Sequence, residues 1–130
     1  MINVKNIAAQ GDVLFRRVGG IPANARESAQ TGKGPIVVAH SETGHHHVIE
    51  SSGVTLFDLL APSFSGVSPP TVNPLISYLK LDGAFADVVH RRSHDTHETL
   101  RLLGAENGPA YYEVRRQREH TPLGWRRALD

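Results

Sequence analysis

Residues 35–50 read PIVVAH-SETG-HHHVIE, and this stretch decides the predicted fold. The β-branched run Ile36–Val38 predicts a strand, Ser41–Gly44 predicts a tight turn, and His45–Glu50 predicts a returning strand. Two strands joined in this way form a β-hairpin. The same alternation of short apolar runs and turn residues continues along the chain, which contains 12 glycines and 8 prolines among 130 residues.

Six further strands are predicted from short apolar or alternating runs, at residues 11–18, 54–60, 75–81, 86–90, 99–103 and 110–117. The segment 24–34 is polar and predicts a loop. No amphipathic helical period is sustained over a useful length. We therefore expect an all-β fold, either a small antiparallel barrel or a two-sheet sandwich with a long Pro-rich loop.

The whole chain, residues 1–130, is expected to form a single β domain, because half of it would bury too small a core. Residues 61–74 contain four prolines and predict a loop or an arm. Residues 120–130 predict a C-terminal tail, with a short helical turn at 125–129.

Charge and composition exclude several classes of function. Lys and Arg total 14 against 13 Asp and Glu, and the resulting net charge of +1 makes nucleic-acid binding an unfavoured prediction. The absence of Cys excludes disulfides and thiolate metal sites. The N-terminal residues do not resemble a signal peptide, and no stretch is long and apolar enough to span a bilayer. We expect a soluble protein without membrane contact.

Histidine gives the clearest chemical pattern. His45 and His47 are two residues apart, so they lie on one face of the expected strand. His94 and His97 are three apart, which suits a turn that brings both rings together. The two pairs predict a site for one divalent metal ion, with Zn, Ni, Cu and Fe as candidates.

Carboxylates near these pairs extend the prediction. Glu50 and Glu98 are the acidic side chains nearest to them in sequence, and Asp95 could accept a hydrogen bond from a ligating ring. Histidines in turns and on strand faces are also common surface groups, so the spacing leaves both interpretations open. His40 and His120 stand apart and are expected to be structural or surface residues.

The run Gly44–Glu50 partly resembles the first metal motif of cupins, an H-x-H pair followed by a Glu. Cupins have a longer gap before the Glu, and their second motif, P-x-G followed by a His, has no clear counterpart here. The resemblance implies a metal-dependent enzyme acting on a small molecule. No complete set of catalytic residues can be assigned, so we assign none.

Four motifs follow one another along the chain: QGDVL at 10–14, TGHHH at 43–47, HDTH at 94–97 and RQRE at 116–119. Their order resembles a family of small uncharacterised proteins of bacteria and their phages, which carry Q-G-D-V-L, T-G-H-x-H, H-x-x-H and R-Q-R-E-Y. The resemblance extends from Gln10 to about Asp130, with His120 in place of the Tyr and residues 61–74 as an addition. It implies that His45, His47, His94 and His97 form one site, and it implies no activity.

Two segments predict a protein partner. Phe64 and Val67 in the Pro-rich segment would be poorly covered on a small monomer. Trp125 beside Arg126 and Arg127 has the composition of an interface anchor. The expected partners are protein subunits of a larger assembly or further copies of the chain.

These observations together predict a non-enzymatic structural or assembly protein. The specific form that we predict is a phage virion component such as a capsid decoration (cement) protein, found in the host cytoplasm during assembly and then in the virion. The alternatives are a cupin-like metal-dependent enzyme and a small metal-binding regulatory module.

Overall fold

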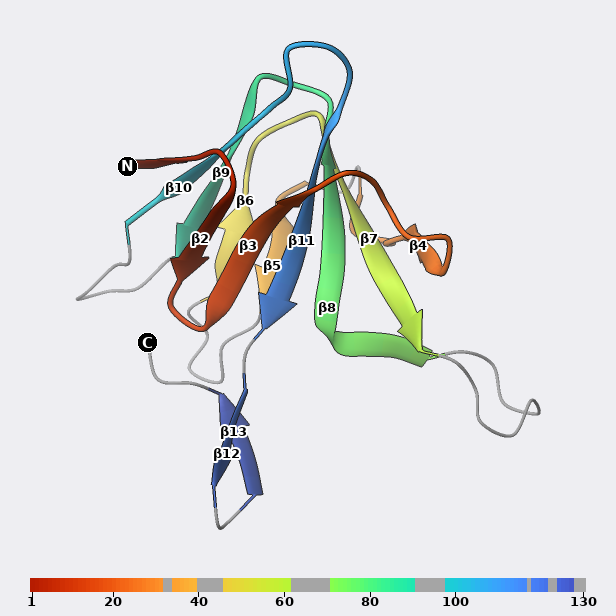
Figure 1. Cartoon of the computed structure of the whole chain (residues 1–130), viewed down its shortest axis with the longest axis vertical. Helices are drawn as coiled ribbons and strands as arrows, with labels where there is room; N and C mark the ends of the chain where they lie inside the picture. Colours follow the sequence, from red (N-terminus) through yellow and green to blue (C-terminus); the bar gives the residue numbers. More distant parts are fainter. Residues whose placement is uncertain are drawn as a thin grey trace.

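A computed structural model shows two β-sheets packed face to face, with the strands running roughly along the long axis of the molecule (Figure 1). The structure describes residues 1–31, 34–39, 46–61, 71–90, 98–116, 118–121 and 124–127. Within these ranges there is no helix, and hence none that could cross a membrane. The strand orders leave both sheets open, so the predicted all-β fold is confirmed in its sandwich form.

The first sheet has five strands in the order β1 (Ile2–Val4), β10 (Leu100–Leu103), β9 (Phe85–His90), β6 (His47–Ile49) and β5 (Ile36–Ala39). The β1–β10 pair is parallel, and the other pairs are antiparallel. The predicted hairpin of residues 35–50 is present as the β5–β6 pair, with its turn outside the described residues.

The second sheet has six antiparallel strands in the order β2 (Ile7–Gln10), β3 (Val13–Val18), β11 (Ala110–Arg116), β8 (Thr71–Leu81), β7 (Val54–Ala61) and β4 (Ala25–Glu27). A separate hairpin follows β11 and consists of β12 (Arg118–Thr121) and β13 (Gly124–Arg127). Only the backbone of this hairpin is described.

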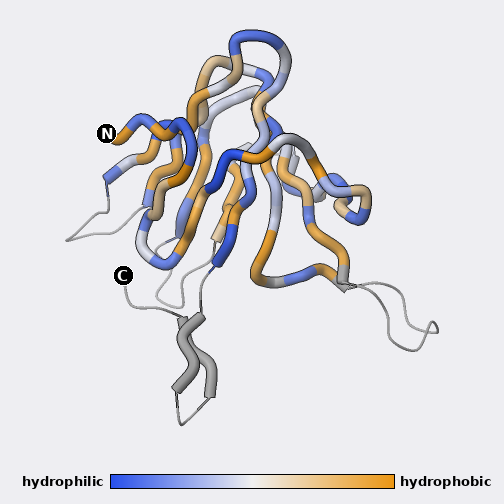
Figure 2. The backbone as a smooth tube through the Cα atoms, in the orientation of Figure 1, coloured by the Kyte–Doolittle hydropathy of each residue, from blue (hydrophilic) through white to orange (hydrophobic). Residues whose placement is uncertain are grey.

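Alternate residues of the strands fill the space between the sheets, as the period of two requires. Phe15, Leu79 and Tyr112 of the six-stranded sheet are fully buried against Val88 and Leu102 of the other sheet and their neighbours. Figure 2 shows these strands as largely hydrophobic and the loop between β10 and β11 as hydrophilic. The core therefore lies in one layer between the two sheets.

The buried Tyr112 also joins the sheets through its hydroxyl group. That oxygen lies 2.7 Å from the carbonyl oxygen of Leu103 and 3.2 Å from that of Val4, both in the five-stranded sheet. Burial raises the pKa of Tyr112, so the phenol stays protonated and keeps its donor. The polar end of this large side chain is therefore paired inside the core.

The structure corrects two local predictions and adds two short strands that were not predicted. Residues 25–27 form β4 within the segment predicted as a loop, because they pair with residues 57–59 at the sheet edge. Residues 124–127 form β13 and pair with residues 118–121, so the predicted helical turn at 125–129 is wrong. Short strands at 2–4 and 7–10 were not predicted: the first pairs in parallel with residues 100–102, and the second pairs with residues 13–16 across a two-residue turn.

The Pro-rich segment is shorter than predicted. β7 continues to Ala61 and β8 starts at Thr71, so only residues 62–70 of the predicted loop 61–74 lie outside the described residues. Pro74 fits within β8 because the register between the two strands shifts there: Asp58 pairs with Ser77, but Leu60 pairs with Val72. A bulge of this kind needs no ladder donor from the proline, and β8 bends at this level (Figure 1).

Gly104 follows β10 and lies close to the backbone of Gly83 and Ala84, so a substitution there tests how tightly these two segments pack. A Cβ atom added there would lie 2.3 Å from the carbonyl oxygen of Gly83 and 3.0 Å from that of Ala84, and backbone atoms cannot easily move away. We expect Gly104→Ala to lower the free energy of unfolding by about 1–3 kcal/mol in urea denaturation. Gly19→Ala is the control, because nothing lies within 4 Å of its added Cβ, and an equal effect of the two changes would contradict the packing.

Candidate functional site

A tight turn brings two polar side chains to one end of the sandwich. β2 ends at Gln10, β3 begins at Val13, and these two residues are paired, so Gly11 and Asp12 form a two-residue loop. Gly11 has a φ of 61°, whereas no residue other than glycine has a positive φ among the described residues. This combination is the pattern of a type II′ turn, which requires glycine at its first central position. Gln10 and Asp12 are both buried.

The side-chain amide of Gln10 connects the two sheets. Its Nε2 donates hydrogen bonds to the carbonyl oxygen of Val88, at 2.9 Å, and to that of Glu98, at 3.0 Å. Its Oε1 lies 2.9 Å from Nδ1 of His47. Gln10 belongs to the six-stranded sheet, while β9 and β6 belong to the five-stranded sheet, so one buried amide fastens the sheets together.

His47 stacks on His90 inside the sandwich. The two residues are direct partners across the β6–β9 ladder, and their ring centroids are 3.9 Å apart with an angle of 13° between the planes. Both residues are 1% exposed, so the stacked pair belongs to the interior. Nε2 of His47 lies 3.7 Å from Oδ1 of Asp12. Gln10, Asp12, His47 and His90 are called the buried polar cluster below.

The hydrogen bonds of Gln10 determine the tautomer of a neutral His47 ring. Because both bonds to carbonyl oxygens need the NH₂ group, the atom that faces His47 must be the carbonyl oxygen Oε1. An oxygen acceptor requires a proton on Nδ1 of His47. In the neutral ring Nε2 then carries the lone pair, and it is directed towards the side of Asp12.

The four histidines of the predicted metal site are only partly visible. His47 lies in the buried polar cluster, whereas His45, His94 and His97 lie outside the described residues, so the four-histidine site stays a prediction. Among the residues that the structure describes, no group of three or more His, Asp or Glu side chains could hold a metal ion. His40 also lies outside the described residues, and for His120 only the backbone is described.

The predicted carboxylates have different surroundings. Glu98 is exposed and its carboxylate pairs with the amino group of Met1. Glu50 is exposed, whereas His47 is buried. The His and the Glu of the cupin-like pattern therefore lie in different surroundings, one in the interior and one at the surface. Asp95 lies outside the described residues. Sequence patterns missed Asp12 and His90 as neighbours of His47, although the resemblance had included Gln10 and Asp12 in its first motif.

The structure describes none of the side chains that were predicted to bind a partner. Phe64 and Val67 lie outside the described residues, and for Trp125, Arg126 and Arg127 only the strand backbone is described.

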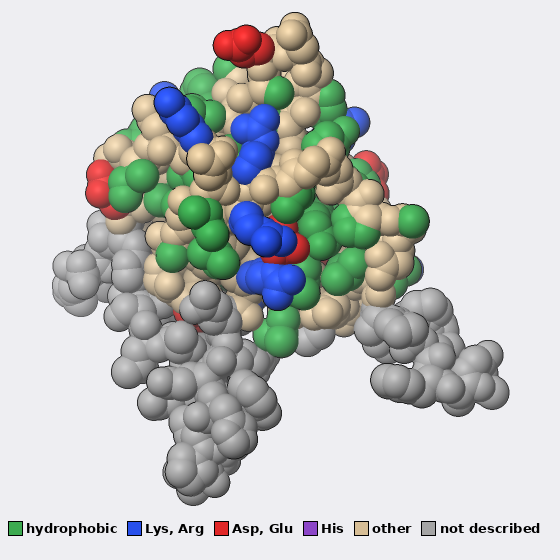
Figure 3. Space-filling model, in the orientation of Figure 1, with side chains coloured by type: hydrophobic (Ala, Val, Ile, Leu, Met, Phe, Trp, Pro, Cys, Tyr) green, Lys and Arg blue, Asp and Glu red, His purple; other side chains and the backbone are tan. Residues whose placement is uncertain are grey.

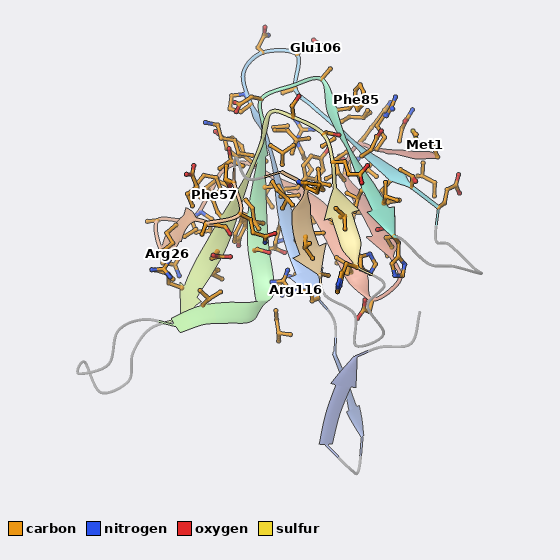
Figure 4. The ribbon with its side chains drawn as sticks, turned by 180° about the vertical axis from the view of Figure 1, so that it is seen from behind. Met1, Arg26, Phe57, Phe85, Glu106 and Arg116 are labelled. Atoms are coloured by element: carbon orange, nitrogen blue, oxygen red, sulfur yellow. The ribbon has the colours of Figure 1, made fainter. Side chains whose placement is uncertain are left out.

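Arg116 is visible at the end of β11, near β5 (Figure 4). Its Nη1 donates to the carbonyl oxygen of Val38, at 2.8 Å, and to Oγ of Ser77, at 2.9 Å, so this arginine helps to join the two sheets.

A second polar group lies on the outer face of the six-stranded sheet. Glu113 of β11 is buried there between Arg16 of β3 and Tyr78 of β8, its direct partners across the ladders, and beside Arg115. Its carboxylate accepts hydrogen bonds from all three, from Arg16 at 3.3 Å, Tyr78 at 3.2 Å and Arg115 at 2.5 Å. The side chains of the two arginines are each 51% exposed.

The surroundings of Glu113 shift two pKa values. Burial alone would raise the pKa of Glu113, but the hydrogen bond and charge of Arg115, with the charge of Arg16, outweigh it, and the pKa is lowered. Burial raises the pKa of Tyr78, and the neighbouring negative charge raises it further, so its hydroxyl remains a donor. The carboxylate is therefore held in its charged form beneath two exposed cations.

These contacts define the class: a two-sheet β-sandwich with a histidine pair between its sheets and a basic outer face. The chain belongs to the family described as Domain of unknown function (DUF8820), whose model matches residues 9–117. The matched range contains the whole buried polar cluster and ends before β12. Comparisons with curated proteins and with solved structures give no match.

The role of Gln10 can be measured through stability. Gln10→Ala removes two buried hydrogen bonds and one part-buried hydrogen bond, and leaves two carbonyl oxygens and one imidazole N–H without this partner. We expect the free energy of unfolding to fall by about 3 kcal/mol in urea denaturation. Asn24→Ala is the matched control, since its amide donates one exposed hydrogen bond to the carbonyl of Leu60. A loss below about 1 kcal/mol for Gln10→Ala would show that the amide does not fasten the sheets.

The lowered pKa of Glu113 predicts a dependence of stability on acid. The unfolded chain takes up this proton at a higher pH than the folded protein, so the contribution is complete above the ordinary glutamate pKa and is lost as the pH falls through the lower folded value. We expect Glu113→Gln to cost about 1–2 kcal/mol at pH 7, and the difference from the unmodified chain to shrink as the pH falls below about 4.

The measurement is urea denaturation of both chains over a pH series. The control is Glu106→Gln, which changes an exposed glutamate in the loop between β10 and β11, marked in Figure 4, and it should leave the profile unchanged. A stability difference for Glu113→Gln that does not vary with pH would mean that the carboxylate charge contributes nothing.

Proposed function

We propose that the protein is a non-enzymatic assembly subunit that docks onto an acidic protein surface through the outer face of its six-stranded sheet. The observation that carries the proposal is the composition of that face over the central strands β3, β11 and β8. The residues that point outward there are Leu14, Arg16, Val18, Ile76, Tyr78, Lys80, Tyr111, Glu113 and Arg115. We call this set the outer face.

The outer face is unusually apolar for a sheet surface in contact with water. An antiparallel sheet with one solvated face normally alternates apolar and polar residues, but β3 reads VLFRRV and is apolar on both sides in its first half. Leu14, Ile76 and Tyr111 are half-buried on the outer side. Tyr and Arg are also the side chains that interfaces favour over other surfaces. This composition supports a docking surface.

The positive charge of the outer face favours a partner with an acidic surface. Arg16, Lys80 and Arg115 are its cations, and Glu113, its only acidic residue, lies buried beneath two of them. Figure 3 shows the basic side chains in a column along the middle of this face, with hydrophobic side chains on both sides. Two copies meeting face to face would bring like charges together, which disfavours self-association. A different subunit with carboxylates among aliphatic residues fits better.

The finer form of the proposal is a virion component such as a capsid decoration protein. It rests on the resemblance of the four motifs to small proteins of bacteria and their phages. The alternatives, a cupin-like enzyme and a small metal-binding regulatory module, stay predictions.

The test is co-sedimentation of the chain, expressed at its natural level in its own source, on a density gradient. We expect the unmodified chain to move with a large particle. The double variant Leu14→Ser, Lys80→Glu should stay at the top of the gradient, because both changes alter the outer face without touching the contacts of Glu113. Mass spectrometry of the particle fraction then identifies the partner.

The matched control is Ile2→Ser, Lys5→Glu, which makes the same exchanges at exposed positions beside the five-stranded sheet. It should move with the particle. If the unmodified chain sediments only as a monomer, the assembly function is wrong. If both double variants move with the particle, assembly uses another surface. A particle consisting only of this chain, or of nucleic acid and this chain, would contradict the acidic protein partner.

A further inference from the structure

The strand β2 forms one edge of the six-stranded sheet, and alternate residues of it direct their backbone groups away from the sheet (Figure 1). The amide of Arg17 donates to the carbonyl oxygen of Asn6, so Asn6 faces β3. Because the residues of an antiparallel strand face their partner strand alternately, Ile7 and Ala9 face the free edge. Among the described residues, none forms a hydrogen bond with the backbone N–H or C=O groups of these two.

The three other edge strands of the sandwich are less open than β2. The free edge of β5 is covered by Gln30, whose Oε1 accepts from the N–H of Val37 at 2.9 Å and whose Nε2 donates to the carbonyl oxygen of Val37 at 3.1 Å. β4 carries the exposed charges of Arg26 and Glu27, which protect a sheet edge from pairing. β1 faces β10 through its first and last residues, so its free edge offers the groups of Asn3 alone.

Exposed aliphatic side chains are concentrated in the segment that contains β1 and β2. Five large hydrophobic side chains are exposed in the described part of the chain, and Met1, Ile2 and Ile7 are three of them. Ile7 is the direct partner of Arg16 across the β2–β3 ladder and is 57% exposed. Ala9 exposes its small side chain on the same side of the sheet. A strand added to β2 would therefore cover apolar surface as well as backbone groups.

We propose that two copies of the chain pair edge to edge through β2, antiparallel and about a twofold axis at Ala8, so that their six-stranded sheets become continuous. In this register Ile7 of each copy lies opposite Ala9 of the other. The N–H and C=O groups of both residues then form four hydrogen bonds across the axis. A register centred on Ile7 or on Ala9 would pair one of them with the corner before β2 or with the turn after it, and would form fewer bonds.

The side chains along β2 suit this self-pairing. Directly opposite residues of paired strands have Cβ atoms about 4.5–5.5 Å apart, so the large Ile7 of one copy lies beside the small Ala9 of the other, twice by symmetry. Arg16 and its counterpart in the other copy are separated by three strand spacings, about 14 Å. This separation exceeds the screening length of about 8 Å at physiological ionic strength, so the like charges do not oppose the contact.

This pairing goes beyond the docking function and does not depend on it. In the strand order of the sheet, β11 lies two positions from β2 and β8 lies three. A pair formed through β2 therefore keeps both outer faces uncovered on the same side of the continuous sheet. The contact is small, so we expect a weak dimer that dissociates on dilution.

The test is sedimentation velocity of the purified full chain, without a tag, at concentrations up to about 1 mM. We expect an equilibrium between monomer and dimer. In a sample that mixes ¹³C-labelled and unlabelled chains, we expect NOEs between the methyl groups of Ile7 in one copy and of Ala9 in the other. Ala9→Pro removes an N–H that β3 does not use, and proline is tolerated at such edge positions. This variant should keep its circular dichroism spectrum and its urea midpoint but stay monomeric.

The matched control is Glu27→Pro, in the strand at the opposite edge of the same sheet. The amide of Ser28 donates to the carbonyl oxygen of Leu56, so Ser28 faces β7 and Glu27 faces outward. A proline at this position should leave the dimer unchanged. A second variant, Ile7→Glu, puts no proline in β2 and places a carboxylate beside Arg16. It should raise the dissociation constant of the dimer at least about tenfold, because a charge replaces an apolar side chain at the contact.

Several results would overturn the proposal. One is a chain that stays monomeric at every concentration, and another is a dimer that persists unchanged in Ile7→Glu and in the folded Ala9→Pro variant. Equal loss of the dimer in Glu27→Pro and Ala9→Pro would show that β2 is not the contact, and so would a dimer without the NOEs between Ile7 and Ala9. If Ala9→Pro does not fold, Ile7→Glu decides. Particle binding is measured separately, so failure of the pairing and failure of the docking function are distinguishable.

Discussion

The sandwich depends on the buried amide of Gln10. Hydrophobic contacts bring the two sheets together, but they are not directional and leave the sheets free to slide. The amide adds three directed bonds, to two carbonyl oxygens and to the ring of His47, all from the opposite sheet or the segment leading into it. Burying such a group is unfavourable unless every polar atom is paired, so the register of the sheets is set where all three bonds can form. Arg116 and Tyr112 join the sheets in the same way at other points.

The eight predicted strands are present as β3 and β5 to β11, whereas the short edge strands β1, β2 and β4 were not predicted. The runs at 54–60, 75–81, 86–90 and 110–117 correspond to β7, β8, β9 and β11, because each combines apolar side chains with flanking turn residues. β1, β2 and β4 are three or four residues long and carry no such signal. β1 and β4 exist because distant strands offer unpaired backbone groups, as Leu100–Leu102 do for β1, whereas β2 pairs with β3 across the turn at Gly11 and Asp12. Long-range pairing of this kind is not encoded in the local pattern of a short segment.

The candidate site, like the fold, could be predicted only in part from the sequence. Spacing identified His47, since an i, i+2 pair of histidines in a strand is visible in the sequence. Nothing local indicated that His47 would lie opposite His90, because that contact follows from the order β9–β6 in the sheet. Asp12 reaches the same ring only through the tight turn at Gly11 and the packing of the second sheet on the first. A site assembled from both sheets becomes visible only after the sheets have been placed.

The alternation of β3 separates the buried polar cluster from the outer face, although the same strand runs beside both. Val13 and Phe15 point into the core, directly after Asp12 of the buried polar cluster, whereas Leu14 and Arg16 point outward beside Arg115 and Glu113. A change at Leu14 therefore alters the outer face without reaching His47, and a change at Asp12 leaves the pairing of Arg16 with Glu113 intact. Effects at sites without shared contacts are expected to add. Variants of the buried polar cluster and variants of the outer face can therefore be tested one at a time, and the core residues Val13 and Phe15 are the direct physical connection between the two regions.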